Sequence, residues 1–282
     1  MKMKRLTLLA AALLACAAAF AQDTTAEEFK ARYERLVRNV GYSGVGVETL
    51  LDRWEEAWPE DTDVPVARFN YYLDKSQRTE MVAKPGLKKY LGNPPSMTLK
   101  SPEGEDIPYF EENLYDDGLF GEAIQVLDRQ IAARPAELRF RYLKASALLN
   151  YEKEHPDMAA NELRQLIKLH TSSRPSWTLD GEPAGEDVFQ QGIGEFCYLF
   201  CQVGSPDSYE YFRDISEQMN KLFPKNPVFL DNIGSYWQVA MGNDKQAAKY
   251  YKKALKLDPE DFAARRNLQI IEKKQAASKK KK

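Results

Sequence analysis

The feature that most constrains the fold is a pair of helical segments that recurs along the chain, bounded by asparagine or aspartate followed by proline. Its clearest copy runs from 227 to 259, and the turn Gly242-Asn243-Asp244 divides it. In both halves, apolar residues recur three or four positions apart, which lines one face of a helix. Asn226-Pro227 and Asp258-Pro259 each place a capping side chain before a proline at a first helical position. The segment is therefore predicted to form two packed helices.

Weaker copies of this pattern occupy most of the remaining chain. The predicted pairs are 25–40 with 46–58, 136–151 with 156–170, and 186–203 with 206–222, and a further match covers 118–135. A final helix over 260–276 is expected to cap the array, with Phe262, Leu268 and Ile271 facing inward and charged residues facing water. Helix following helix in this way predicts an all-α fold.

The units resemble tetratricopeptide (TPR) repeats, in which small residues mark the crossing of two helices and a proline closes the unit. The residues that carry this resemblance are Gly234, Tyr251 and Pro259 in one copy, and Gly121-Glu122-Ala123 with Pro135 in another. The resemblance implies a right-handed α-solenoid of four to five helix pairs within residues 22–272. Together with the inserts described next, the chain is similar to exported TPR proteins of Bacteroidetes, which implies a place in the cell envelope.

Two segments interrupt the helical pattern. Residues 76–107 contain four prolines and three glycines, and short apolar runs at 81–82 and 97–99 are interpreted as a small β-ribbon. Residues 171–185 contain Trp177 and the run Asp180-Gly181-Glu182-Pro183. Long irregular segments in a compact domain are often functional, so both inserts are candidate sites.

The N-terminus reads as an export signal over residues 1–21. A cationic start is followed by an apolar stretch and the small-x-small site Ala19-Phe20-Ala21, which predicts a mature chain that begins at Gln22. The apolar stretch is shorter than the ~20 residues of a membrane-spanning helix. A competing interpretation is a lipid anchor at Cys16, because Leu13-Leu14-Ala15-Cys16 resembles a lipobox. The location is therefore periplasmic or secreted, or alternatively that of a membrane-anchored lipoprotein.

Charge argues against nucleic acid as the partner. The whole chain has a formal net charge of −2, yet six lysines lie in the last ten residues, so the body is strongly acidic. Binding to phosphates needs a basic surface instead. The lysine-rich segment 273–282 is expected to be a disordered tail.

Few residues suggest chemistry. Gly41-Tyr42-Ser43-Gly44-Val45-Gly46 lacks the strand and Gly-Lys-Ser/Thr ending of a phosphate loop and is interpreted as a turn between helices. Cys197 and Cys201 are interpreted as buried thiols, and two histidines are too few for a recognisable metal or nucleophile site. No cofactor is expected, and a hydrolase that uses acidic residues of the inserts is the weakest alternative.

Aromatic and polar residues on the predicted first helices are the candidate binding residues. A partner peptide or protein is expected on the concave surface, because aromatic residues and arginine are common anchors of interfaces. The candidates are Tyr71, Tyr72, Arg139, Tyr142, Asn232 and Tyr236. The leading hypothesis is a non-enzymatic scaffold for protein–protein interaction. The alternative is a glycan- or small-ligand-binding protein in which Trp177 and the 76–107 insert form the pocket.

Overall fold

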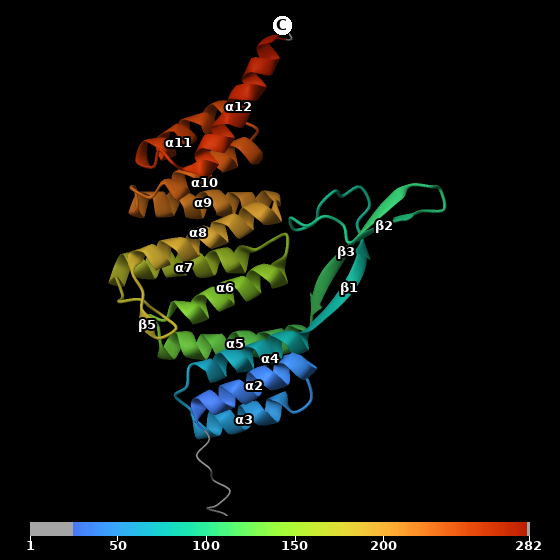
Figure 1. Cartoon of the computed structure of the whole chain (residues 1–282), viewed down its shortest axis with the longest axis vertical. Coiled ribbons are helices and arrows are strands. Elements are labelled where there is room, and N and C mark those ends of the chain that lie inside the picture. Colours follow the sequence, from blue (N-terminus) through green and yellow to red (C-terminus); the bar gives the residue numbers. More distant parts are fainter. Residues whose placement is uncertain (1–24, 281–282) are drawn as a thin grey trace, which may run out of the picture. The chain divides into compact units, whose positions relative to one another are not determined.

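A computed structural model describes residues 25–280, and Figure 1 shows the helices and strands of the chain. The predicted signal peptide and Cys16 lie outside these residues. The described chain forms two compact units, one made of residues 25–76 and 117–126 and the other of residues 77–116 and 127–280. Within the described residues, no helix is both long and apolar enough to cross a membrane.

The first unit is a small helical bundle. It contains α2 (Ala26–Val40), α3 (Val47–Ala57), α4 (Asp63–Ser76) and the first part of α5 (Asp117–Ala133). Trp54 of α3 lies at the centre of this bundle and is 1% exposed, and the ring of Phe29 lies parallel to its ring with 6.3 Å between the centroids. The glycine-rich segment 41–46 is the turn between α2 and α3, as predicted, and Gly41 and Gly46 have φ of 83° and 86° there.

The second unit contains a stack of helix pairs, which confirms the predicted all-α array. Successive helices pack against each other from α8 to α12, α6 packs on α7, and each first helix also contacts the first helix of the next pair. The helices are α6 (Leu138–Glu152), α7 (Asp157–Ser173), α8 (Glu186–Val203), α9 (Pro206–Leu222), α10 (Pro227–Val239), α11 (Asp244–Leu257) and α12 (Phe262–Lys280).

Caps and small residues set the helix boundaries and the close crossings. Asn226 and Ser205 accept hydrogen bonds from the backbone N–H of Val228 (3.0 Å) and Ser208 (3.1 Å), so both predicted helix starts are confirmed. At the crossing of α10 and α11, a Cβ on Gly234 would lie 2.6 Å from the ring of Tyr251, which is fully buried. Only glycine lets the two helices approach this closely.

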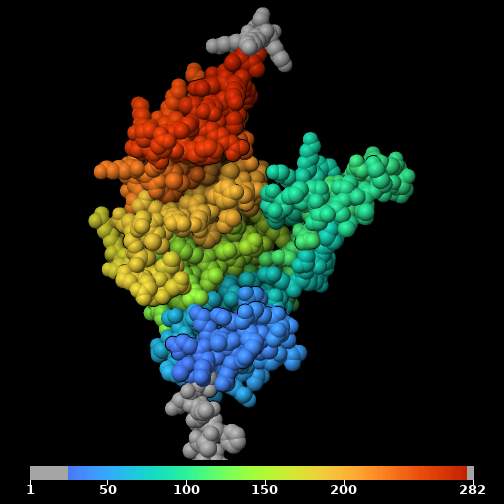
Figure 2. All heavy atoms as spheres, in the orientation of Figure 1, coloured from blue at the N-terminus to red at the C-terminus, as the bar shows by residue number. Residues whose placement is uncertain are grey.

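The first insert is larger than predicted and its strands pair differently. It forms β1 (Gln77–Ala83), β2 (Met97–Lys100) and β3 (Asp106–Tyr115), in the order β1-β3-β2. The runs at 81–82 and 97–99 are strands, but each pairs with β3 and not with the other. The predicted boundary at 107 was wrong because β3 is rich in polar residues; its strand character comes from pairing on both sides. Figure 2 shows the insert standing out beside the helices of its unit.

The second insert is a short hairpin held by one carboxylate. Its strands are β4 (Thr178–Leu179) and β5 (Glu182–Pro183), within the predicted segment 171–185. Glu137, which precedes α6 and is 6% exposed, accepts from the Thr178 hydroxyl at 2.8 Å and from the N–H groups of Asp180 and Gly181 at 3.0 Å each. This carboxylate ties the hairpin turn to the helices.

The C-terminal helix corrects two expectations. Phe262 was expected to face inward, but it is 74% exposed, whereas Ala264 and Ile271 are buried against α10 and α11. The helix also continues through 273–280, where a disordered tail was expected. No glycine or proline follows Asp261, and alanine and lysine favour helix, so nothing in this segment ends α12 earlier.

Candidate functional site

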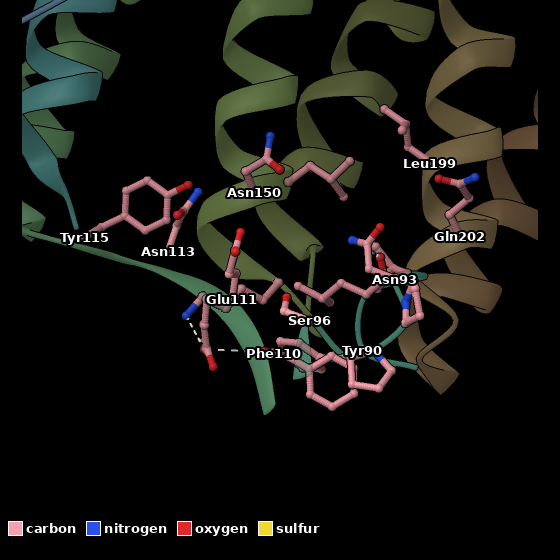
Figure 3. A pocket seen from close by; sticks show the side chains of 17 residues that line it. Tyr90, Asn93, Ser96, Phe110, Glu111, Asn113, Tyr115, Asn150, Leu199 and Gln202 are labelled. Atoms are coloured by element: carbon pink, nitrogen blue, oxygen red, sulfur yellow. Dashed lines mark hydrogen bonds and ion pairs between the residues drawn. The ribbon is translucent and has the colours of Figure 1, made fainter. Parts of the chain in front are cut away.

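A hollow of about 650 Å³ opens where the first insert meets the ends of two helices (Figure 3). We call it the junction hollow. Residues from the 90–96 loop, β3 and the C-terminal ends of α6 and α8 line it, namely Tyr90, Leu91, Asn93–Ser96, Phe110–Asn113, Tyr115, Leu149, Asn150, Lys153, Leu199, Gln202 and Val203. It lies entirely within the second unit.

A tight turn seats the loop wall of the hollow against α8. The backbones of Tyr90 and Asn93 exchange two hydrogen bonds of 2.9 Å, and the two residues between them have positive φ, 47° at Leu91 and 82° at Gly92. A Cβ on Gly92 would lie 2.9 Å from the carbonyl oxygen of Gln202. Glycine is therefore required both by the backbone angle and by the contact with α8.

Glu112 connects the insert to α6 and also holds the loop. Its carboxylate forms ion pairs with Lys153, the C-cap residue of α6, and with Lys84 at 3.3 Å. Lys84 also lies over the ring of Tyr90, with its Nζ 3.8 Å from the ring centroid. Burial alone would raise the pKa of Glu112, but the hydrogen bonds and charges of the two lysines outweigh it, so the pKa is lowered. Glu112 therefore stays ionised and keeps the insert docked.

Three carboxamides face the hollow, and two of them keep one polar end unused. Asn113 accepts from Thr79 through Oδ1 (2.8 Å), Asn150 donates through Nδ2 to the Ser146 carbonyl (2.9 Å), and Gln202 donates through Nε2 to Tyr198. Asn113 also makes a side-chain hydrogen bond with Tyr115. Among residues 25–280, the Oδ1 of Asn150 and the Oε1 of Gln202 make no hydrogen bond. The hollow therefore offers two acceptors to a polar ligand.

Apolar and acidic groups complete the lining. Leu149, Leu199 and Val203 provide aliphatic surface, and the exposed Glu111 lies in the middle of the lining residues (Figure 3). α6 and α8 both end at the hollow, and the last carbonyls of a helix carry partial negative charge. These ends and Glu111 supply negative charge beside the two lysines that pair with Glu112.

None of the seven residues predicted from the sequence lines this hollow. Tyr71 and Tyr72 belong to the first unit, where Tyr71 is 4% exposed and donates to Glu48 at 2.8 Å. Tyr72 is half-buried, with its ring edge against Tyr71. Tyr236 is 2% exposed and donates to Glu210 of α9 at 2.6 Å. The Nδ2 of Asn232, one turn earlier on α10, is buried and has no hydrogen-bond partner among residues 25–280. Tyr71 and Tyr236 are therefore core residues.

The remaining three candidates lie around the second insert. Arg139 forms an ion pair with Asp180 at 3.0 Å, and Tyr142 packs against Gly192 of α8. Trp177 is 4% exposed and donates from Nε1 to Nδ1 of His170 at 2.9 Å. The ring of Trp177 is stacked on Phe189 at 5.7 Å inside the core.

The exposed face of the first helices is hollowed elsewhere. A shallower depression of about 450 Å³ follows one stripe of α8, including Gln191, Gly194, Glu195 and Tyr198, and reaches Val228 of α10. Tyr198 is 61% exposed there. The spacing of three and four positions along α8 was available in the sequence, but which side of the helix faces solvent was not.

The thiols and imidazoles have structural environments. Cys197 is fully buried, and burial raises the pKa of its thiol to about 12. His170 is stacked on Phe189 at 4.3 Å, and burial lowers the pKa of its imidazole. His155 is exposed and paired with Asp207 at 2.8 Å. Within the described residues, no group of three or more potential metal ligands occurs.

Comparisons with known proteins give structural likenesses but no relative by sequence. No protein-family model matches the chain, and no curated protein matches it. A solved structure described as "MamA RS-1 ArsTM double mutant" is similar with a TM-score of 0.37 and 13% sequence identity, covering 84% of this chain and 96% of that one.

Proposed function

We propose that this chain is a non-enzymatic binding protein that holds an extended segment of a partner protein in the junction hollow. The observation that carries the proposal is the pair of half-used carboxamides of Asn150 and Gln202 beside aliphatic surface. Their unused carbonyl oxygens would accept hydrogen bonds from the N–H groups of a peptide backbone. An extended peptide leaves these groups free, whereas a helix uses them internally.

Charge suggests what the bound segment carries. Glu112 is paired with two lysines, whereas Glu111 is exposed and its carboxylate forms no ion pair within residues 25–280. The helix ends beside it add partial negative charge. A lysine or arginine side chain of the bound segment would pair with Glu111, while neighbouring apolar side chains would rest on Leu149 and Leu199.

A glycan fits the hollow less well. Sugar rings pack on open aromatic faces, but Tyr90 and Phe110 are 6% and 2% exposed and pack edge to face against each other at 5.8 Å. Tyr115 turns its ring toward Tyr151. The carboxamides alone would also suit hydroxyl groups, so a set of oligosaccharides belongs in the binding test as a competing ligand class.

A role without catalysis is supported by the chemistry of the reactive groups. Cys197 is buried in its protonated form, and the imidazole of His170 is enclosed between aromatic rings. Neither side chain lines the junction hollow. The residues around the hollow are suited to holding a ligand in place.

We further propose that the protein works in the bacterial cell envelope, as the N-terminal sequence predicts. Export with cleavage after Ala21 would leave Gln22 at the N-terminus, and lipidation would leave a modified Cys16. Mass spectrometry of the processed protein distinguishes these two forms. An intact Met1 on protein from the native cell would refute both.

The binding proposal is tested with an array of extended peptides and a parallel array of oligosaccharides. We expect peptides with a basic residue beside apolar ones to bind, and the double variant Asn150→Ala with Gln202→Ala to weaken them about tenfold or more. Glu111→Lys should act selectively on the basic peptides. Gln165→Ala, at an exposed position on α7, is the matched control. Binding that is unchanged by the double variant, or binding of oligosaccharides only, would refute the proposal.

A further inference from the structure

The outer edge of β1 is an open row of backbone hydrogen-bonding groups. The N–H of Lys84 donates to the carbonyl of Pro108 at 3.0 Å, and the antiparallel register continues from this pair through the strand. Hydrogen-bonded pairs alternate along an antiparallel ladder, so the even-numbered residues of β1 bond to β3. The backbone groups of Gln77, Thr79 and Met81 therefore point away from β3, where a further strand could pair.

The other edge of the same sheet is blunted. β2 has only four residues, Pro94-Pro95 precedes it and Pro102 follows it, and proline removes the donors that a new strand would need. β1 has seven residues and no proline. The two edges of this sheet are therefore unequal, and β1 is the one that can accept a partner.

The charges on β1 identify a suitable partner. Arg78 and Glu80 flank Thr79 on one face of the strand, and their side chains are 74% and 48% exposed. If a second β1 paired antiparallel about a two-fold axis at Thr79, Arg78 of each copy would lie opposite Glu80 of the other. A pairing centred on Glu80 would instead place two glutamates opposite each other, which is destabilising.

We propose that two copies of this chain associate through β1, antiparallel and with the two-fold axis at Thr79, to form one continuous six-stranded sheet. In this register Thr79 pairs with Thr79 of the other copy, and Gln77 pairs with Met81 of the other copy. These are the residues whose backbone groups point away from β3, so the register agrees with the open edge. The dimer would also join the two exposed apolar faces that carry Met81, Met97 and Leu99, each 42–50% exposed. This association is independent of the junction hollow.

The test is a measurement of mass in solution by analytical ultracentrifugation over about 1–100 μM protein. We expect the wild-type chain to shift from monomer to dimer in this range. Arg78→Glu and Glu80→Arg should each weaken the dimer about tenfold or more, because each places like charges opposite one another. Mixing the two variants should restore a heterodimer, since both opposite-charge pairs then re-form.

Two further variants separate edge pairing from loss of fold. Thr79→Pro removes an outward N–H that β3 does not use, so it should abolish the dimer while the circular dichroism spectrum is retained. Lys100→Glu makes the same charge change as Arg78→Glu on the blunted edge and should leave the dimer intact. A monomer at every concentration, a dimer insensitive to Thr79→Pro, or a mixture that fails to recover would each overturn the proposal.

Discussion

Gly234 of α10 offers the sharpest test of how the helix pairs are held together. The nearest ring carbon of Tyr251 would be 2.6 Å from a Cβ at this position, and the ring is fully buried with nowhere to move. We therefore expect Gly234→Ala to push the ring away from α10. The displacement would also break the hydrogen bond from the Tyr251 hydroxyl to Gln238, which is 2.6 Å long.

The change in the free energy of unfolding caused by Gly234→Ala is the balance of a gain in helix propensity and a loss from overpacking. Alanine is favoured over glycine in a helix by ~0.8–1 kcal/mol. Overpacking a buried ring costs ~1–3 kcal/mol, and the lost hydrogen bond costs ~1 kcal/mol more. The two costs exceed the gain in helix propensity, so the free energy of unfolding should fall by about 1–3 kcal/mol. For a chain of this size each kcal/mol lowers the melting temperature by about 2–4 °C.

Gly194 of α8 provides the matched control. A Cβ there would meet its nearest neighbour, Cγ1 of Val228, at 3.9 Å, an ordinary van der Waals distance. Gly194→Ala therefore gains helix propensity without a clash and should raise the melting temperature by about 2–4 °C. Thermal unfolding followed by circular dichroism measures both variants. If the two substitutions shift the melting temperature in the same direction, close approach at Gly234 does not limit the packing.

Three other predictions follow from single contacts. Glu137→Ala should make the amides of Asp180 and Gly181 exchange with deuterium about tenfold faster or more. Glu137→Gln should have a smaller effect because one acceptor oxygen remains. Equal exchange rates in the two variants would contradict the anchoring role of Glu137. Burial and the charge of Asp261 raise the pKa of Asp231 to about 7, so the folded state binds this proton more tightly and stability should fall as pH rises from about 4 to 7. Asp231→Asn should match the wild type near pH 4 and exceed it by about 1–3 kcal/mol at pH 8 in urea unfolding, and a difference independent of pH would count against this assignment. Gly92→Ala should release the loop and make tryptic cleavage after the exposed Lys88 and Lys89 faster. Gly86→Ala, at a similar φ but with no atom within 4 Å of its Cβ, should have less effect. Similar cleavage of both variants would mean that the contact with Gln202 is unimportant.

Helix boundaries were predictable because their signals are local. Asn226 and Ser205 cap the helices that they were expected to begin, and the predicted segments 186–203 and 206–222 agree with α8 and α9. A helix start depends on a few neighbouring residues, and these can be read directly. The same is true of the close crossing at Gly234.

The sheet and the binding surface depended on contacts that are distant in sequence. β3 is the central strand because β1 and β2 pair with it on either side. The sequence of residues 106–115 alone does not predict a central strand. On α10, neighbouring residues in the sequence point about 100° apart around the helix axis. An error of one position in the predicted alignment is therefore enough to explain why Tyr236 contacts α9. The junction hollow combines residues from 90 to 203, so its members could not be grouped from spacing alone.

The first insert begins and ends at the same place. Gln77 and Tyr115 are direct partners in the β1–β3 ladder, so the two points where the chain leaves and rejoins the helices are neighbours, about 5 Å apart. Ser76 at the end of α4 and Asp117 at the start of α5 could then be joined by a short turn, which would remove forty residues without stretching the helices that remain in the first unit. The insert could thus have been gained in a single step during evolution. It could also be exchanged for another hairpin while the helices on either side of it are kept.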